Sequence, residues 1–90
     1  MGQPIMQRVA MKYVYLLQSV NHPRQRYIGL TSDVDARVAA HNAGQAPHTS
    51  KYRSWRLCTA IRFEDDERAV AFEAYLKTGS GWAFAKRHFW

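Results

Sequence analysis

Cysteine is almost absent from this chain, because Cys58 is the only one among its 90 residues. A disulfide within the chain is therefore excluded, and so is a structural zinc site built from several thiolates. Long apolar runs are missing as well, since no stretch approaches the roughly 20 residues that a membrane-spanning helix requires. The sequence thus predicts a protein without disulfides or membrane spans, for which the reducing cytoplasm is the simplest location.

Acidic residues are also scarce, with seven Asp and Glu against thirteen Lys and Arg, so the formal net charge is +6. On a chain of this size, such a surplus favours a polyanionic partner, with nucleic acid ahead of an anionic membrane surface. Several basic residues, with Tyr52 and Trp55 among them, are placed to follow a nucleic-acid backbone. They are Arg24, Arg26, Lys51, Arg53, Arg56, Lys86 and Arg87. The alternative interpretation is an ordinary solvated surface.

The length and composition predict one folded domain. Ninety residues suffice for a single small core, and an apolar content of 47% argues against a disordered chain. Residues 1–11 lack the continuous apolar segment of a signal peptide. We interpret them as a loose N-terminal extension, so that the domain is expected to span residues 12–90.

The first strand is predicted over residues 12–20, which are rich in aromatic, aliphatic and β-branched side chains. Its alternation places Tyr13 and Tyr15 on one face and Val14 and Leu16 on the other. Both faces are largely apolar, as expected of a central strand that is covered on both sides.

Two further strands follow from the same pattern. A turn over residues 21–25 leads into a short strand at residues 26–30, where Gly29 leaves space for another group to approach the backbone. Residues 55–63 alternate cleanly, with Trp55 and Phe63 on the same side. This predicts a third strand with one strongly apolar face.

The intervening segments predict helices. Residues 33–42 form the first helix, since Asp33 or a preceding hydroxyl can cap its amides and Gly44 is placed to end it. Residues 43–54 are polar and are expected to be an exposed loop without regular structure, of the kind that often carries function.

Two helices complete the chain. Acidic residues 64–67 suit the start of a helix that runs to about Lys77, with Ala69, Phe72, Leu76 and Tyr75 on its inner side. Residues 78–81 are expected to end that helix. A closing helix follows over residues 82–90 and packs Trp82, Ala85 and Phe89. The order β-β-α-β-α-α predicts an α+β domain with a small three-stranded antiparallel sheet flanked by helices.

Glu73 and Arg37 each allow two interpretations. Glu73 lies at the border of a buried helical stripe, where it either pairs with Lys77 or binds a hard cation such as Mg²⁺. Arg37 either pairs with Asp33 on an exposed helix face or holds the charge that grows on a reacting phosphate. His41, one helical turn after Arg37, either supports that phosphate or is an ordinary surface histidine.

The tripeptides Tyr13-Val14-Tyr15 and Tyr27-Ile28-Gly29 resemble the paired strand motifs of the GIY-YIG nuclease superfamily. The similarity covers nearly all of residues 12–89 and is greatest to the small stand-alone branch of putative endonucleases. It continues through Thr31, Asp33, Arg37, His41, Asn42 and Gly44, and resumes at Ala69, Glu73, Tyr75, Leu76, Lys77, Gly79, Ser80 and Gly81. One departure is Tyr13, which stands where the family has a glycine.

This resemblance implies the roles of the candidate residues. Tyr15 and Tyr27 become active-site tyrosines, Arg37 the phosphate-binding arginine, His41 an auxiliary group and Glu73 the metal-binding carboxylate. The implied reaction is hydrolysis of a DNA phosphodiester with a single Mg²⁺, for which Mn²⁺ is a substitute. A tyrosine then serves as general base towards water, and Gly29 favours Tyr27 by opening space beside it.

Two other functions are compatible with the sequence. One is a nucleic-acid-binding module that keeps the fold without turnover. The other is a protein-interaction domain that docks through the aromatic segment of residues 82–90. The sequence leaves open the DNA substrate, the oligomeric state and the pathway, and a protein partner is one source of specificity.

Overall fold

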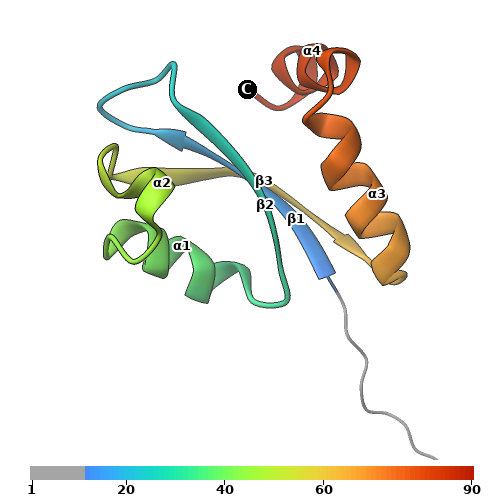
Figure 1. Cartoon of the computed structure of the whole chain (residues 1–90), viewed down its shortest axis with the longest axis horizontal. Helices are drawn as coiled ribbons and strands as arrows, with labels where there is room; N and C mark the ends of the chain where they lie inside the picture. The colour runs from blue at the N-terminus through green and yellow to red at the C-terminus, as the bar shows by residue number, and fades with distance from the viewer. Residues whose placement is uncertain (1–11) are drawn as a thin grey trace, which may run out of the picture.

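Residues 12–90 are described by a computed structural model, in which helices flank both faces of one antiparallel sheet (Figure 1). The elements are β1 (Lys12–Ser19), β2 (Arg26–Thr31), α1 (Val34–Asn42), α2 (Pro47–Ser50), β3 (Trp55–Phe63), α3 (Asp66–Leu76) and α4 (Gly79–His88). The fold class and the antiparallel three-stranded sheet predicted from the sequence are confirmed. The expected N-terminal extension, residues 1–11, lies outside the described residues.

β1 is the central strand, because the strand order is β2-β1-β3. On one face, Val14 and Leu16 pack with Ala69 of α3 and Ala85 of α4. On the other face, Tyr15 and Leu17 pack with Trp55 of β3 and Val38 of α1. The predicted burial of β1 on both faces is therefore confirmed, and the sheet separates the α1 side from the α3 side.

The prediction that β3 keeps one apolar face along its length is wrong. The register shifts between Leu16, which pairs with Thr59, and Leu17, which pairs with Leu57, so that Cys58 is an extra residue in β3. Such a bulge exchanges the two faces of a strand. Consequently Trp55 packs on the α1 side and Phe63 on the α3 side.

α1 begins and ends where the sequence predicts. The Asp33 side chain accepts a hydrogen bond from the Ala36 amide at 3.1 Å, which satisfies a free donor of the first turn. Gly44 follows the helix with φ +79°, a conformation that favours glycine.

Most of residues 43–54 are exposed, as predicted, but the expectation that they lack regular structure is wrong. They contain the short helix α2, whose first residue is Pro47, and Thr49 is buried with 2% of its surface exposed. The Trp55 indole donates to the Thr49 carbonyl at 2.9 Å. The Asn42 side-chain amide accepts from the Trp55 backbone N–H at 2.6 Å and donates to the Trp55 carbonyl at 3.0 Å. These bonds tie α2 and α1 to the start of β3.

Two details of the last helices differ from prediction. Tyr75 lies on the outer side of α3, with 41% of its surface exposed. α4 begins at Gly79, before the predicted start, because the Thr78 hydroxyl caps it and Gly81 allows the backbone of Tyr75 to approach. A Cβ at Gly81 would lie 1.7 Å from that carbonyl oxygen. Within residues 12–90, none of the helices has the length and apolarity needed to cross a bilayer.

Candidate active site

The Tyr15 phenol lies directly over Gly29 of the neighbouring strand. The two residues are register partners, and a Cβ built on Gly29 would lie 2.6 Å from the Tyr15 hydroxyl oxygen. The expectation that Gly29 admits another group is thus confirmed. That group is Tyr15, however, so Gly29 does not open space for Tyr27.

Gly29→Ala is expected to lower the free energy of unfolding by about 1–3 kcal/mol, because the buried Tyr15 ring must move to admit the methyl group. Gly79→Ala is the matched control, since nothing lies within 4 Å of the Cβ that it would add. Denaturant unfolding of the two variants measures the difference. Equal stabilities would contradict the close packing of Tyr15 on Gly29.

Tyr15 is hydrogen-bonded into a buried chain of side chains. Its hydroxyl lies 2.9 Å from His41 Nε2, and His41 Nδ1 lies 2.7 Å from Thr49 Oγ1. His41 is fully buried, so its interpretation as an ordinary surface histidine is wrong. The Tyr27 ring also packs against the imidazole, with centroids 4.7 Å apart. β1, β2, α1 and α2 therefore each place one side chain in this chain of contacts.

Arg37 joins the same group of residues. Its guanidinium lies beside the Tyr15 phenol, and their interaction raises the pKa of Arg37 above its ordinary value. Burial raises the pKa of Tyr15 above 10.0, while the neighbouring guanidinium of Arg37 opposes that shift. The Arg37 side chain thus contacts phenols, and the alternative of an ion pair with Asp33 is not what the structure has. We call Tyr15, Tyr27, Arg37 and His41 the tyrosine cluster.

The pKa of His41 is lowered below 6.5, first by burial and then by the charge of Arg37. The folded protein therefore binds fewer protons than the unfolded chain just below that value, so protonation favours unfolding. We expect the free energy of unfolding to fall as the pH drops from about 8 to about 5, and to fall less in His41→Gln. Chemical denaturation at both pH values measures this, and parallel losses in the two proteins would contradict it.

Glu73 forms an ion pair with Lys77, with Oε2 and Nζ 2.5 Å apart, while 17% of the Glu73 side chain is exposed. The salt bridge weighed from the sequence is therefore present. This ion pair is compatible with metal binding by Glu73, because a partly exposed carboxylate can release a flexible lysine and bind a hard cation instead. No group of three or more His, Cys, Asp and Glu side chains suited to a metal occurs within residues 12–90. A single carboxylate is a donor set that Mg²⁺ accepts, since this ion usually keeps several of its waters.

Glu73 is not a contact partner of the tyrosine cluster in the described residues, and α3 packs on the opposite face of the sheet from α1. β2 is an edge strand, however, and carries Tyr27. A ligand along that edge is accessible from α1 on one face and from α3 on the other. Figure 1 shows α1 and α3 on the two sides of the sheet, with the strands between them.

The basic residues predicted to follow nucleic acid lie near one end of the sheet. Arg24 is in the β1–β2 turn, and Arg26 and Arg56 flank Gln18 across β1. Arg56 donates to the Gln18 side chain at 2.6 Å, and the Arg26 guanidinium lies 5.4 Å from the centre of the Trp90 ring. The others are placed as follows: Lys51 over Tyr52, Arg53 against Gly44, and Lys86 and Arg87 in the last turn of α4.

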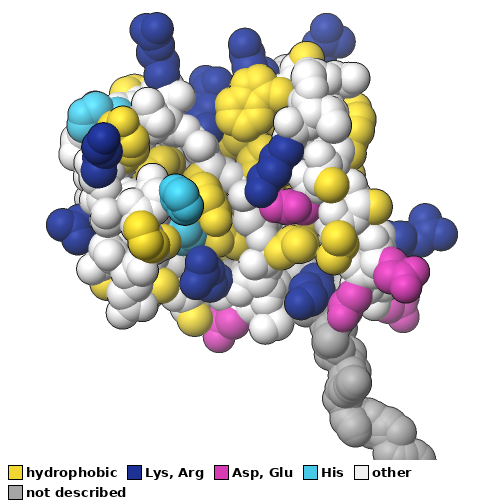
Figure 2. All heavy atoms as spheres, viewed as in Figure 1, with side chains coloured by type: hydrophobic (Ala, Val, Ile, Leu, Met, Phe, Trp, Pro, Cys, Tyr) yellow, Lys and Arg dark blue, Asp and Glu magenta, His cyan; other side chains and the backbone are white. Residues whose placement is uncertain are grey.

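The acidic residues other than Glu73 lie away from this end. They occupy the β2–α1 and β3–α3 connections and the first turns of α1 and α3: Asp33, Asp35, Glu64, Asp65, Asp66 and Glu67. Figure 2 shows basic side chains along the upper edge, over the β1–β2 turn and α4, and most acidic ones on the lower side. The molecule is therefore electrostatically asymmetric, and an anionic strand is attracted to the basic end.

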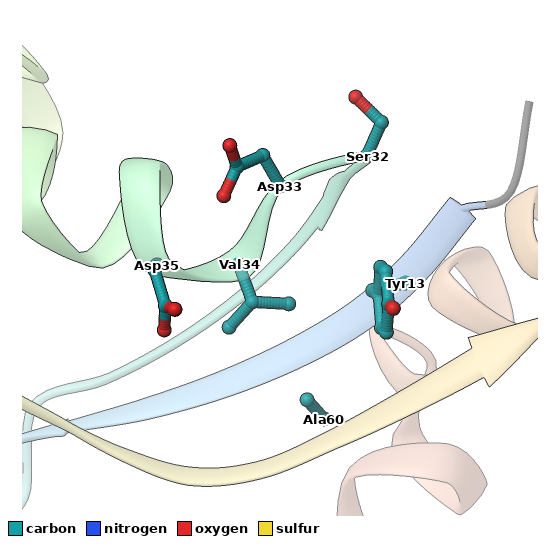
Figure 3. Close-up of a pocket in the computed structure, with 6 residues that line it drawn as sticks. All are labelled: Tyr13, Ser32, Asp33, Val34, Asp35 and Ala60. Atoms are coloured by element: carbon teal, nitrogen blue, oxygen red, sulfur yellow. The ribbon is translucent and has the colours of Figure 1, made fainter.

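A hollow of about 310 Å³ lies at the start of α1, and no residue of the tyrosine cluster lines it. Its lining is Tyr13, Ser32, Asp33, Val34, Asp35 and Ala60. Figure 3 shows Val34 directed towards Tyr13 and Ala60, with a carboxylate on either side of it. Because two carboxylates repel a phosphate, the hollow is not a phosphate site. A phosphate would instead be attracted to the guanidinium of Arg37.

Sequence reasoning missed Thr49. It lies in the segment interpreted as a polar loop, and a threonine among Pro47, Ser50 and other polar residues carries no pattern that distinguishes it. Only the fold of α2 shows that its hydroxyl reaches His41.

Comparisons with known proteins identify the family. The family model of the GIY-YIG catalytic domain matches residues 11–82. The UPF0213 protein of Streptococcus pyogenes serotype M3 is 35% identical over 69 residues, which cover 72% of this chain and 70% of the relative. Its counterpart in serotype M5 (strain Manfredo) is 33% identical with the same coverage. The chain therefore belongs to the GIY-YIG nuclease superfamily, and its relatives are small stand-alone members of that family.

Proposed function

We propose that this chain is a DNA endonuclease that hydrolyses phosphodiester bonds with a divalent cation, preferentially Mg²⁺. The observation that carries the proposal is the tyrosine cluster, where two phenols pack with the imidazole of His41 and the guanidinium of Arg37 acts on the Tyr15 phenol. A planar fork of donors next to proton-transferring hydroxyls suits a phosphate whose charge grows during displacement. Membership of a nuclease superfamily supports the same chemistry.

The two phenols take different roles because their exposures differ. Tyr15 has 1% of its surface exposed and contacts both Arg37 and His41, so it orients these groups. Tyr27 is partly exposed on the edge strand, so it is the phenol that meets water and substrate. Tyr27 is therefore the proposed general base, and Arg37 stabilises negative charge on the phosphate.

Glu73 is the proposed metal-binding residue. A cation bound there would polarise the phosphate and stabilise the leaving oxygen. For this, Lys77 must release the carboxylate that it now holds. The proposal thus requires Glu73 and Arg37 to act on one phosphate from opposite faces of the edge strand β2.

DNA binding is expected to be steeply salt-dependent because the basic end neutralises phosphates. If four phosphates are contacted, affinity falls by about 10²-fold between about 50 and about 200 mM salt. Arg24→Gln and Arg56→Gln should flatten that dependence, whereas Arg68→Gln should not, because Arg68 lies among the acidic residues of α3 and pairs with Asp65. Fluorescence anisotropy with labelled duplexes measures the slopes. An affinity independent of salt would contradict the basic footprint.

The ion pair of Glu73 with Lys77 also favours a second candidate, a binding module of the same fold without turnover. In that case the carboxylate has a purely structural partner. The interaction-domain alternative is weaker, because the aromatic residues of this segment pack against the hydrophobic core, namely Trp82, Phe89 and Trp90.

A cleavage panel tests the proposal. Plasmid, single-stranded, nicked and branched DNA, with RNA as a comparison, are incubated with the parent protein and Mg²⁺, Mn²⁺ or a chelator. Cleavage of at least one DNA form with a metal, abolished by the chelator and by Arg37→Ala, supports the nuclease. Tyr27→Phe should slow cleavage more than Tyr15→Phe. DNA binding without cleavage of any form would favour the binding module, and substrates cut preferentially would define the specificity.

A further inference from the structure

Thr49 occupies an unusual place for a threonine outside the catalytic motifs. It has 2% of its surface exposed, and its hydroxyl oxygen lies 2.7 Å from His41 Nδ1 and 3.4 Å from the Ala46 carbonyl oxygen. Its own carbonyl accepts the Trp55 indole at 2.9 Å. The side chain is therefore held from two sides, with its hydroxyl directed at the buried imidazole.

The hydrogens in this chain can be assigned from its donors and acceptors. A hydroxyl has one hydrogen, and we place it on the contact with the Ala46 carbonyl, because that oxygen can only accept whereas His41 Nδ1 can donate. The Thr49 oxygen then faces His41 Nδ1 with a lone pair, which requires a hydrogen on Nδ1. A neutral imidazole has one N–H, so Nε2 is bare and accepts the Tyr15 hydroxyl at 2.9 Å.

We propose that Thr49 is a positioning residue, which holds His41 as its Nδ1–H tautomer so that the Tyr15 hydroxyl donates to Nε2. Arg37 can only donate, and it needs a lone pair of the Tyr15 oxygen. With the hydrogen on Nε2 instead, His41 would also donate to that oxygen and compete with Arg37. Thr49 thus orients the guanidinium of Arg37 indirectly, through the side chains of His41 and Tyr15. This role rests on the proposed nuclease function.

The charged and titratable groups around His41 are consistent with a neutral ring. Tyr15 faces it from β1, Tyr27 from β2 and Arg37 from α1, while α2 contributes the uncharged Thr49. No carboxylate is hydrogen-bonded or ion-paired to the imidazole within residues 12–90. Burial and Arg37 lower the pKa of His41, so it remains neutral near neutral pH and the tautomer decides which atom donates.

The first test does not depend on catalysis. Nitrogen-15 NMR of the parent protein separates protonated from unprotonated ring nitrogens, and we expect His41 to carry its hydrogen on Nδ1. His41→Gln identifies the resonance. A hydrogen on Nε2 would overturn the proposal, whether or not the protein cuts DNA. Conversely, the protein could carry the Nδ1 hydrogen and yet cut no DNA. That result would contradict the proposed nuclease function and support the tautomer assignment.

The second test uses Thr49→Val, which keeps the shape of the side chain without its hydroxyl, and Thr49→Ser, which keeps the hydroxyl. Losing an orienting hydrogen bond to a functional histidine typically costs about 10- to 100-fold in activity, so Thr49→Val should lower kcat by that factor with little change in KM. Thr49→Ser should restore both kcat and the Nδ1–H resonance. Equal kcat in parent and Thr49→Val, or a loss that serine does not rescue, would overturn the positioning role.

Discussion

Replacing Arg37 with alanine is expected to lower the rate of DNA cleavage by about 10²–10³-fold, the loss that follows removal of one donor to a developing oxyanion. Arg37 is the guanidinium beside Tyr15 on the α1 side, so this variant leaves the phosphate without that fork of donors. Single-turnover cleavage of a DNA substrate from the panel, with saturating protein, isolates the chemical step from binding. Ground-state affinity for DNA should change far less than the rate.

Two further variants separate the role of Arg37 from its charge. Arg37→Lys keeps the positive charge but not the planar fork, so we expect it to recover only part of the rate. Arg68→Ala removes an exposed arginine from α3 and should leave cleavage unchanged. If Arg37→Ala and Arg68→Ala cleave equally fast, Arg37 does not bind the reacting phosphate.

The fold was predictable from local pattern because its central strand is buried on both faces. Alternation in β1 correctly separated Tyr15 from Leu16, and these two residues belong to the two opposite core clusters. Asp33 and Gly44 marked the ends of α1 through backbone chemistry that operates within a few residues. Such features depend on residues that are close to one another in the chain, so the sequence alone is enough to predict them.

Features that depend on distant partners were not predictable. The bulge at Cys58 exchanges the faces of β3, and nothing in an alternating segment shows where one residue is unpaired. Thr49 is buried because α2 folds under Trp55, a contact that polar composition argues against. Gly81 was interpreted as a helix breaker, but it lies inside α4, where its missing side chain admits the Tyr75 carbonyl.

The candidate site was predictable in part. Tyr15, Tyr27, Arg37 and His41 were named from motif spacing, and the structure brings them together. The sequence could not show that His41 is buried, nor that Tyr15 fills the space over Gly29, because both depend on how β2 and α1 pack on β1. The convergence of Glu73 with this cluster remains a prediction.

Glu73→Gln is expected to lower cleavage at a fixed Mg²⁺ concentration by at least about 10²-fold, because losing a metal ligand removes several kcal/mol of transition-state stabilisation. Glutamine preserves the shape of the side chain, so α3 should remain folded. Cleavage rates across a Mg²⁺ titration provide the measurement. The half-saturating concentration should rise in this variant, whereas a ligand-independent defect would lower the rate at every concentration alike.

Lys77→Gln distinguishes metal binding from the ion pair that Glu73 forms now. Both substitutions abolish the pair between Oε2 and Nζ, and both cost little in stability because Lys77 is half exposed. If Glu73 binds the cation, only Glu73→Gln loses activity, and Lys77→Gln reaches half-saturation at a lower Mg²⁺ concentration because its carboxylate no longer has a competing ammonium. If the pair serves only the helix, the two variants behave alike. Equal behaviour would therefore remove Glu73 from the proposed mechanism and favour the binding module without turnover.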